Sequence, residues 1–297
     1  MTAPHEAGAL SQFAPAKINL ALHVVGRRAD GYHLLDSLVA FATSGDRITV
    51  EPAAEDAFTV SGPYAAGVPL DTGNLILRAR DALRSRIGPT AFPIRIHLEK
   101  NLPIASGIGG GSSDAAATLK ALCALWQSDP PQLDLAALGL SLGADVPMCL
   151  HAQPARVTGI GDGITPISTL PDLPAVLVNP GVAVSTPAIF KQLTTSDNPH
   201  LAPPPDDSAP QTWLDWLANT RNDLQPPAIA VAPIIADVLR HIANTGASFT
   251  RMSGSGATCF GLYATKAQAD AAAAQLSLDH PQWYVQATLL KGSDSAS

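Results

Sequence analysis

The residues best suited to chemistry lie in one glycine-rich segment, Asn101 to Asp114, which contains four glycines and three serines. Glycine lets the backbone approach a ligand closely and adopt positive φ, so successive amide groups can point at one anion. A helix that starts directly after such a segment adds free N–H donors and roughly half a positive charge. The segment therefore predicts a seat for a polyphosphate.

This segment differs from the two common nucleotide-binding motifs. No lysine follows the last glycine before Ser112, which excludes a Walker loop. Ser112 also stands where a dinucleotide fingerprint that starts at Gly107 requires its third glycine. The alternative is a strand-to-helix turn that binds nothing, but four glycines followed by consecutive serines favour the phosphate seat.

Two lone charged residues in apolar surroundings are the candidate catalytic groups. Lys17 lies in an apolar strand, 13–22, whose alternation places it on one face with Asn19. A buried ammonium needs a carboxylate or phosphate nearby; the alternative is a strand-end lysine that reaches solvent. Asp145 is the single carboxylate in the run 142–150, and it either does chemistry in a cleft or caps a turn.

Two further segments indicate recognition of a base and of a phosphate. Asp30-Gly31-Tyr32-His33 contains a turn, an aromatic ring and an imidazole, which can stack on a base and bind its edge. The alternative is an ordinary surface turn. A second glycine turn, 252–257, precedes an apolar run. It either closes over a phosphate or is a tight turn into a strand.

Hydrophobic periodicity predicts the elements that position these groups. Residues 94–99 alternate apolar and polar side chains, as in a half-buried strand. Apolar residues then recur at helical spacing over 119–126, and Ser112 and Ser113 are placed to cap the helix start. The alanine-rich stretch 267–274 predicts a surface helix.

Length and composition predict two domains. The chain has 297 residues, of which 46% are hydrophobic, enough for two cores of about 150 residues each. We expect a domain over 1–160 and a second over 161–297, because a glycine-rich turn at 159–163 precedes a new apolar run. The proline-rich segment 194–212 has few apolar residues and predicts a surface loop or linker.

Charge, hydropathy and cysteine content indicate which partners and which cellular compartment to expect. The net charge is −7 and no basic run exceeds Arg27-Arg28, which argues against nucleic acid as a partner. No stretch approaches the roughly 18–20 apolar residues that cross a bilayer, and the N-terminal residues lack a secretory signal, so we expect a cytoplasmic protein without a membrane partner. Cys123, Cys149 and Cys259 lack metal or redox spacing and are predicted to be buried and reduced.

Together, these segments resemble the GHMP small-molecule kinases over nearly the whole chain. The glycine-rich loop and the second glycine turn are typical of the family at large. The Asp-Gly-Tyr-His and Thr-Pro-x-Ile-Phe segments resemble the branch that phosphorylates a cytidine-diphosphate-linked substrate in the non-mevalonate isoprenoid pathway. The resemblance rests on Pro15 to Leu20, Arg28 to His33, Pro103 to Ser113, Gly143 to Pro147, Asn179 to Gly181, Ser185 to Phe190 and Ser253 to Gly256.

The resemblance implies an α+β fold with an N-terminal domain like domain 2 of ribosomal protein S5 and a C-terminal ferredoxin-like domain. It implies transfer of the γ-phosphoryl group of ATP to the 2-hydroxyl of a methylerythritol group. Asp145 would be the base, and Lys17 would pair with it and stabilise negative charge. Mg²⁺ is expected with ATP, its protein ligands unknown, with Ser113 and Asp114 as candidates. A monomer or weak homodimer is expected.

The same resemblance assigns binding residues. Tyr32 and Phe190 would sandwich the cytosine, with His33 at its polar edge, and Asn19 and Thr186 would complete the acceptor site. Asn74 and Lys100 would lie near the nucleoside of ATP. The residues implied to bind its phosphates are Pro103, Ile104, Ala105, Ser106, Gly107, Ile108, Gly109, Gly110, Gly111, Ser112 and Ser113.

Three other functions are open to these residues. A family member acting on homoserine, mevalonate or a sugar would keep the glycine loop but would not need Tyr32, His33 and Phe190. A silent ATP-binding regulator would not need both Lys17 and Asp145. An RNA-binding module, suggested only by the S5-like fold, conflicts with the acidic balance.

Overall fold

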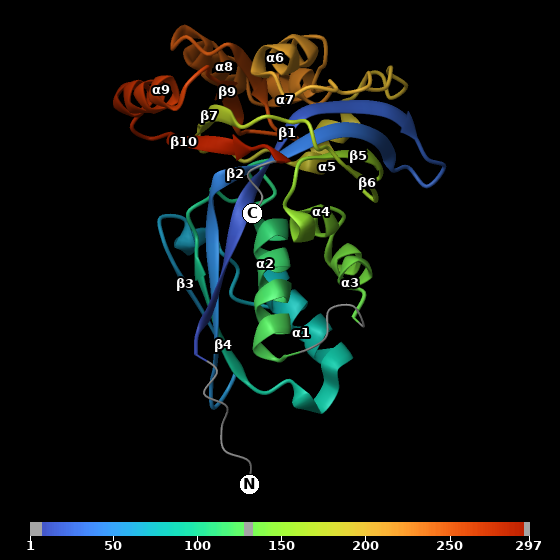
Figure 1. Cartoon of the computed structure of the whole chain (residues 1–297), viewed down its shortest axis with the longest axis vertical. Coiled ribbons are helices and arrows are strands. Elements are labelled where there is room, and N and C mark those ends of the chain that lie inside the picture. Colours follow the sequence, from blue (N-terminus) through green and yellow to red (C-terminus); the bar gives the residue numbers. More distant parts are fainter. Residues whose placement is uncertain (1–7, 128–132, 294–297) are drawn as a thin grey trace. The chain divides into compact units, whose positions relative to one another are not determined.

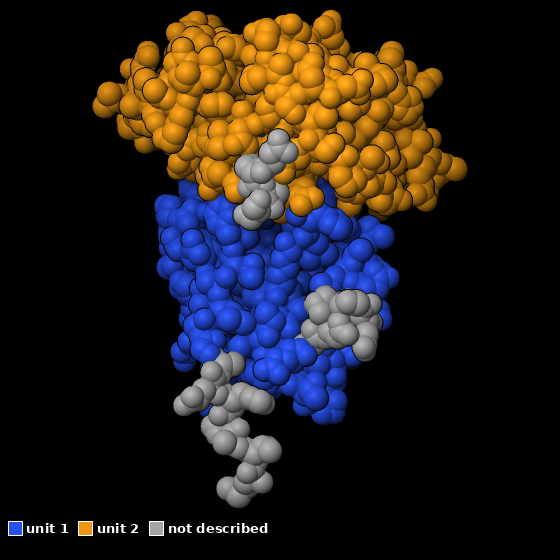
Figure 2. Space-filling model, in the orientation of Figure 1, with its two compact units in different colours: residues 1–15, 45–104, 110–151 blue, residues 16–44, 105–109, 152–297 orange. Residues whose placement is uncertain are grey.

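The computed structural model describes residues 8–127 and 133–293, and these form two compact units (Figure 2). Unit 1 takes its residues from 1–15, 45–104 and 110–151. Unit 2 takes its residues from 16–44, 105–109 and 152–297. The fold class is α+β, as expected. Strands β1 (Leu10–Arg27) and β2 (His33–Pro52) each contribute residues to both units, and the boundary at residue 160 stays a prediction.

Unit 1 is built on the strand that the alternation predicts. Strand β4 (Ile94–Glu99) buries its isoleucines and leucine, which confirms the expected half-buried strand over 94–99. It pairs antiparallel with residues 47–52 of β2 and parallel with β3 (Ala57–Ser61). The helices of this unit are α1 (Leu75–Ile87), α2 (Gly110–Leu125), α3 (Leu135–Leu142) and α4 (Val146–His151), of which α1 and α2 pack against each other (Figure 1).

Helix α2 begins two residues earlier than the sequence suggests. Ser112 and Ser113 were expected to cap its start, but the helix runs from Gly110 and both serines lie within it. Gly109 has φ of 65°, in the left-handed region, so it is the last residue before the helix. The serine hydroxyls are therefore placed along the first turn rather than at the cap.

Strands β5 to β10 of unit 2 form antiparallel pairs within one sheet. Strand β7 (Leu173–Asn179) lies between β10 and β9, β9 pairs with β8, and β10 reaches residues 41–42 of β2. The β5 strand pairs with residues 35–39 of β2 and with β6. The bounds of the other strands are β5 Ala155–Gly159, β6 Gly163–Pro166, β8 Phe249–Met252, β9 Cys259–Leu262 and β10 Tyr284–Lys291.

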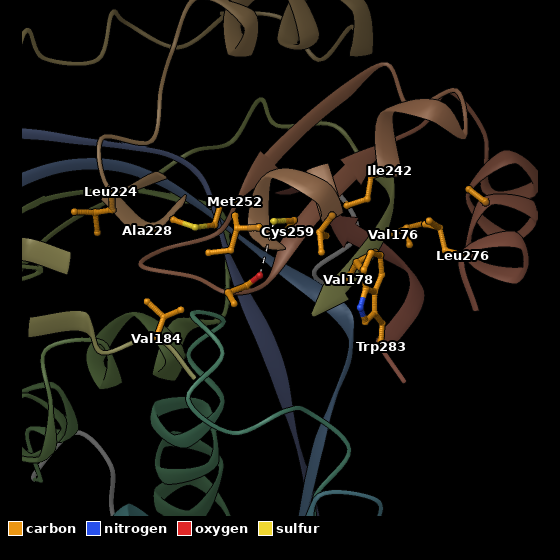
Figure 3. Close-up of a cluster of buried hydrophobic side chains, with 14 of the residues drawn as sticks. Val176, Val178, Val184, Leu224, Ala228, Ile242, Met252, Cys259, Leu276 and Trp283 are labelled. Carbon is orange, nitrogen blue, oxygen red and sulfur yellow. Dashed lines mark hydrogen bonds between the residues drawn. The ribbon is translucent and has the colours of Figure 1, made fainter. Parts of the chain in front are cut away.

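Helices α8 and α9 bury an apolar layer against this sheet (Figures 1 and 3). Val176 and Val178 of β7 meet Ile242 of α8 and Leu276 of α9 in one buried cluster. Helix α9 confirms the helix expected over the alanine-rich stretch, and Thr265 with Gln268 forms a capping box at its start. The helices of unit 2 are α5 Thr186–Lys191, α6 Pro210–Ala218, α7 Gln225–Val231, α8 Ile234–Asn244 and α9 Lys266–Asp279.

The proline-rich segment is a surface loop as far as Ala209, as its composition predicts, and its last residues begin helix α6. Most of its residues are exposed, but Leu201 is buried and the His200 ring contacts the buried Asp36 carboxylate at 2.9 Å. Asn198 donates to the Val24 carbonyl at 3.0 Å. The loop is anchored by one buried leucine together with polar side chains and backbone groups, and a count of apolar residues could not detect the polar contacts.

Cys123, Cys149 and Cys259 are buried, as predicted, and none of them forms a disulfide within the described residues. Over the described ranges, no single helix is long and apolar enough to cross a membrane, and the pair α7 and α8 reaches that length only across a bend of 117°.

Candidate active site

The glycine-rich loop enters helix α2 through a strongly left-handed backbone. Ala105, Gly107 and Gly109 have φ of 51°, 75° and 65°. Of the loop residues predicted from the sequence, 103–104 belong to unit 1 and 105–109 to unit 2, while 110–113 are the first residues of α2. Alternating left-handed residues turn neighbouring amide groups in one direction, which is the geometry of an anion seat.

The second glycine turn packs backbone to backbone against this loop. The Ser253 hydroxyl donates to the Gly107 carbonyl at 3.0 Å, and the Thr258 amide donates to the Ser106 carbonyl at 3.1 Å. A Cβ at Gly107 would lie 2.7 Å from the carbonyl oxygens of both Ser253 and Gly256. Only glycine fits there, so the two glycine segments depend on each other for close packing.

Strand β1 brings two predicted site residues to these glycine segments. The Lys17 amide donates to the Ile108 carbonyl at 2.9 Å, and a Cβ at Gly109 would lie 3.1 Å from Lys17 Cβ. The Asn19 amide donates to the Ser253 hydroxyl at 3.1 Å, while its side chain donates to Ser37 at 2.8 Å. Lys17 and Asn19 are 6% and 5% exposed. Lys17 is therefore a buried lysine of the strand and not one that extends into solvent.

The residues expected to bind cytosine adopt a different arrangement from a simple sandwich. The His33 ring stacks on Phe190, with centroids 4.9 Å apart and 23° between the planes, and Tyr32 is 64% exposed. Burial, together with Arg27, lowers the pKa of His33. A neutral imidazole keeps one donor and one acceptor for a base edge. The Thr186 hydroxyl lies 2.7 Å from that of Ser255 in the second glycine turn.

In unit 1, the two residues predicted near the nucleoside of ATP make internal bonds. Asn74 caps α1, because its Oδ1 accepts from the Ile76 amide at 2.9 Å, and its Nδ2 donates to the Pro69 carbonyl at 2.8 Å. The buried Lys100 ammonium contacts the carboxylates of Asp46 and Asp114. A contact of either residue with ATP stays a prediction.

Sequence reasoning missed Asp46, which fixes the start of the glycine-rich segment. Its fully buried carboxylate accepts from the Asn101 amide at 2.6 Å and the Leu102 amide at 2.8 Å, besides pairing with Lys100. The only signal in the sequence is one acidic residue within a strand pattern. Its partners lie more than 50 residues further along the chain, so no local rule identifies them.

Asp114, in the first turns of α2, shares the Lys100 ammonium with Asp46, and its pKa is raised. Burial raises the pKa of Asp114 to about 8, with Asp46 acting in the same direction against the opposing effect of Lys100. Two buried carboxyl groups thus share one ammonium. Burial therefore favours the protonated form of Asp114, which would reduce the buried charge at the start of the helix.

Asp114→Asn is expected to stabilise the protein at alkaline pH. A carboxyl whose folded pKa lies above its ordinary 3.8 loses stability as pH rises from that value to about 8, because the unfolded chain ionises first. Asparagine cannot ionise, so its free energy of unfolding should exceed the wild-type value by on the order of 1 kcal/mol or more at pH 8.

Urea unfolding at pH 5 and pH 8 measures this effect. Asp81→Asn is the matched control, because the Asp81 side chain is 51% exposed on α1 and should show no such gain. A stability difference for Asp114→Asn that does not grow between the two pH values would show that Asp114 is ionised in the folded protein.

The first turns of α2 also offer oxygen atoms for a cation. The Ser113 hydroxyl and Asp114 Oδ1 are buried without a hydrogen-bond partner. Within residues 8–127 and 133–293, no group of three or more His, Cys, Asp or Glu side chains is placed to hold a metal. The unpartnered Ser113 hydroxyl would suit a hard cation such as Mg²⁺ that phosphate oxygens also bind.

Asp145 is partly exposed and lies directly before α4 in unit 1, whereas Lys17 belongs to unit 2. The structure therefore brings together Lys17, Asn19, the loop 105–109 and the turn 253–256. It places the His33–Phe190 stack in that same unit. The pairing of Lys17 with Asp145 stays a prediction.

Comparison with known proteins shows what the chain is similar to. Family models for the GHMP kinases N terminal domain and the GHMP kinases C terminal match residues 74–153 and 208–281. The chain is 52% identical to the 4-diphosphocytidyl-2-C-methyl-D-erythritol kinase of Chelativorans sp. (strain BNC1), over 96% of this chain and 97% of that one. It is 54% identical to the enzyme of the same name from Brucella melitensis biotype 1, over 96% of each.

Solved structures show the same likeness. The crystal structure of a 4-(cytidine 5′-diphospho)-2C-methyl-D-erythritol kinase matches 95% of this chain and 100% of that chain, with 35% identity and a TM-score of 0.76. The homoserine kinase of Cytophaga hutchinsonii matches 98% of each chain at 16% identity and a TM-score of 0.68, which shows the shared fold alone.

Proposed function

The chain belongs to the GHMP kinases, and within them to the 4-diphosphocytidyl-2-C-methyl-D-erythritol kinases, and from this premise we propose that it phosphorylates the substrate of that name. The γ-phosphoryl group of ATP is transferred to the 2-hydroxyl of the methylerythritol part, a step of non-mevalonate isoprenoid biosynthesis. The observation that carries the proposal is the packing of strand β1 and two glycine segments in the unit that also holds the His33–Phe190 stack.

The loop 105–109 and the first turn of α2 are suited to hold the phosphates of ATP. Their amide groups and the helix dipole supply positive potential without a lysine in the loop. Mg²⁺, when bound with ATP, neutralises charge on the phosphate oxygens. The Ser113 hydroxyl, buried without a hydrogen-bond partner, is the side chain that would hold this cation.

Proton transfer and charge stabilisation are assigned to two residues. Asp145 takes the proton of the attacking hydroxyl as it reaches the γ-phosphorus, which makes the oxygen a better nucleophile. Lys17, whose stem is fixed against Gly109, stabilises negative charge on that oxygen or on the transferred group. Both roles rest on the family resemblance and on the chemistry of the two side chains.

Selectivity for cytidine is assigned to the aromatic residues of unit 2. Phe190 and Tyr32 offer faces for stacking, and His33 offers a donor and an acceptor for the cytosine edge. One face of Phe190 is in contact with the His33 ring. The base therefore stacks on the opposite face of Phe190 or takes the place of His33.

Phe190→Leu is expected to weaken binding of the cytidine substrate selectively. Loss of one base–aromatic stack costs about 1–3 kcal/mol, so the KM for this substrate should rise about 5- to 150-fold, while the KM for ATP stays within about twofold. Steady-state kinetics with each substrate varied in turn measures the split. Phe190→Tyr keeps the stack and is the control; an equal rise in both KM values would argue against a cytosine site at Phe190.

The proposed function is tested by a comparison of acceptors. The purified protein is given Mg·ATP with 4-diphosphocytidyl-2-C-methyl-D-erythritol, homoserine, mevalonate or galactose, and ADP release and the ³¹P spectrum of the product are recorded. We expect turnover with the cytidyl substrate alone. Preference for another acceptor would support a different kinase of the same family, and binding of ATP without transfer to any acceptor would support a silent regulator.

Location and assembly are proposed together with the function. We propose a cytoplasmic monomer or weak homodimer, and three buried cysteines without a disulfide among the described residues support a reducing compartment. Cell fractionation and light scattering test these two points.

A further inference from the structure

A short segment between α6 and α7, residues 219–224, lies against β1 and the second glycine turn. The Leu22 amide donates to the Arg221 carbonyl, and the Asp223 amide donates to the Leu22 carbonyl, both at 2.9 Å. The Asp223 carboxylate accepts from the Val24 amide at 2.7 Å. The segment is thereby attached to the strand that carries Lys17 and Asn19.

Asn222 extends from this segment to the glycine turn, and its side-chain nitrogen and oxygen are both hydrogen-bonded to backbone groups. Its Nδ2 donates to the carbonyls of Met252 and Gly254, both at 2.8 Å, and its Oδ1 accepts from the Leu224 amide at 3.0 Å. The residue is 5% exposed. Two donors and one acceptor are each used once, so an uncharged carboxamide satisfies this position and a carboxylate does not.

The bonds of Asn222 continue through the turn to the predicted phosphate loop. Gly254 packs so closely on the loop that a Cβ there would lie 2.8 Å from the Gly107 carbonyl oxygen. Ser253 accepts from the Asn19 amide and donates to the Gly107 carbonyl. A shift of the turn therefore moves both the loop and the strand.

Neighbouring side chains also fix residues 251–252, which lead into the glycine turn. The Met252 amide donates to the Gln225 side chain at 2.9 Å. The buried Arg251 guanidinium donates to the Leu20 carbonyl and to the Thr220 hydroxyl, both at 2.8 Å. Burial lowers the pKa of Arg251 to about 10. Asn222 is the side chain in this group that contacts the turn beyond Met252.

We propose that Asn222 is a positioning residue for phosphoryl transfer, which holds the turn 253–256 against the loop 105–109 and against β1 at Asn19. This inference rests on the proposed function, since it takes the loop as the seat of the ATP phosphates. Asn222 acts through the turn and does not touch the reacting groups.

The test is the pH dependence of Asn222→Asp. A carboxylate at this site faces two carbonyl oxygens, so the pKa of the introduced acid should be raised and its ionised form should push the turn away. The neutral acid has one O–H and restores one of the two bonds. We expect Mg·ATP to bind about tenfold more weakly than to wild type at pH 8, with most of the affinity recovered at pH 6.

Two readouts separate this inference from the proposed function. The affinity for Mg·ATP is measured by calorimetric titration, which needs no acceptor, and turnover is measured with the cytidyl substrate. Each value for the variant is divided by the wild-type value at the same pH, which gives an ATP-affinity ratio and a turnover ratio. If the wild-type protein shows no turnover, the proposed function is contradicted, but the ATP-affinity ratio still tests Asn222. A rise in both ratios between pH 8 and pH 6 supports both proposals.

The matched control is Asn219→Asp, because Asn219 is an exposed amide of the same segment that donates to the Asp215 carbonyl at 2.8 Å. Both ratios of this control should stay near one at every pH. The inference is overturned if the ATP-affinity ratio of Asn222→Asp is the same at pH 6 and pH 8, whether it is near one or equally low at both. It is also overturned if the control shows a pH dependence of the same size.

Discussion

Asp145→Asn is expected to lower turnover about 10²- to 10⁴-fold with the fold intact, the range that general base catalysis contributes. The amide has the shape of the carboxyl group but cannot accept the proton of the attacking hydroxyl. Binding of ATP should change little, because the residues proposed to bind its phosphates, the loop 105–109 and the first turn of α2, are separate from Asp145 in sequence. Single-turnover measurements at saturating ATP report the chemical step directly.

Asp81→Asn is again the control, since it makes the same chemical change on an exposed part of α1 in the same unit and should leave turnover unchanged. Thermal unfolding of both variants confirms that each is folded. Near-normal single-turnover rates for Asp145→Asn would remove Asp145 from the role of base and leave positioning and charge stabilisation to explain the rate.

The glycine segments could be found from the sequence because their residue types are dictated by space. A Cβ at Gly107 would overlap two carbonyl oxygens, so no other residue fits, and the sequence shows this directly as a glycine. The strand over 94–99 is predictable for a similar reason, because burial of one face requires alternation. Both signals are local in the sequence.

Asp46 and Asn222 could not be found in this way. Each binds backbone groups that are distant in the sequence, Asp46 at residues 101–102 and Asn222 at residues 252 and 254. A side chain that bonds to a backbone amide or carbonyl places no demand on the residue type of its partner. Neither periodicity nor motif spacing records such a bond, although both bonds fix the ends of predicted functional loops.

The contact between His33 and Phe190 belongs to a third class. Both residues were singled out from the sequence, but as separate groups acting on one base. Their stacking depends on how the start of β2 and helix α5 fold within unit 2. The types of the site residues were predictable because chemistry restricts them, whereas their mutual contacts follow from the tertiary fold.

Lys17→Met is expected to reduce turnover by a factor comparable to that of Asp145→Asn while ATP binding is largely retained. Methionine keeps an unbranched apolar stem, so packing at Gly109 and the amide bond from residue 17 to Ile108 should persist. What is lost is the ammonium, which in a buried setting interacts strongly with charge that develops on the nucleophile or the transferred group. Turnover and the Kd of Mg·ATP, measured on the same preparation, separate the two effects.

Lys266→Met serves as the control, because that lysine is exposed on α9 and its loss should change neither quantity. Lys17→Arg adds a second comparison: the charge is kept, but the larger, planar head group must fit where Gly109 already lies close to the lysine stem. If the ammonium acts at a defined point, arginine should recover only part of the rate. Full turnover in Lys17→Met would show that the buried charge has no part in the reaction, and a parallel loss of ATP affinity would instead place it in the phosphate site.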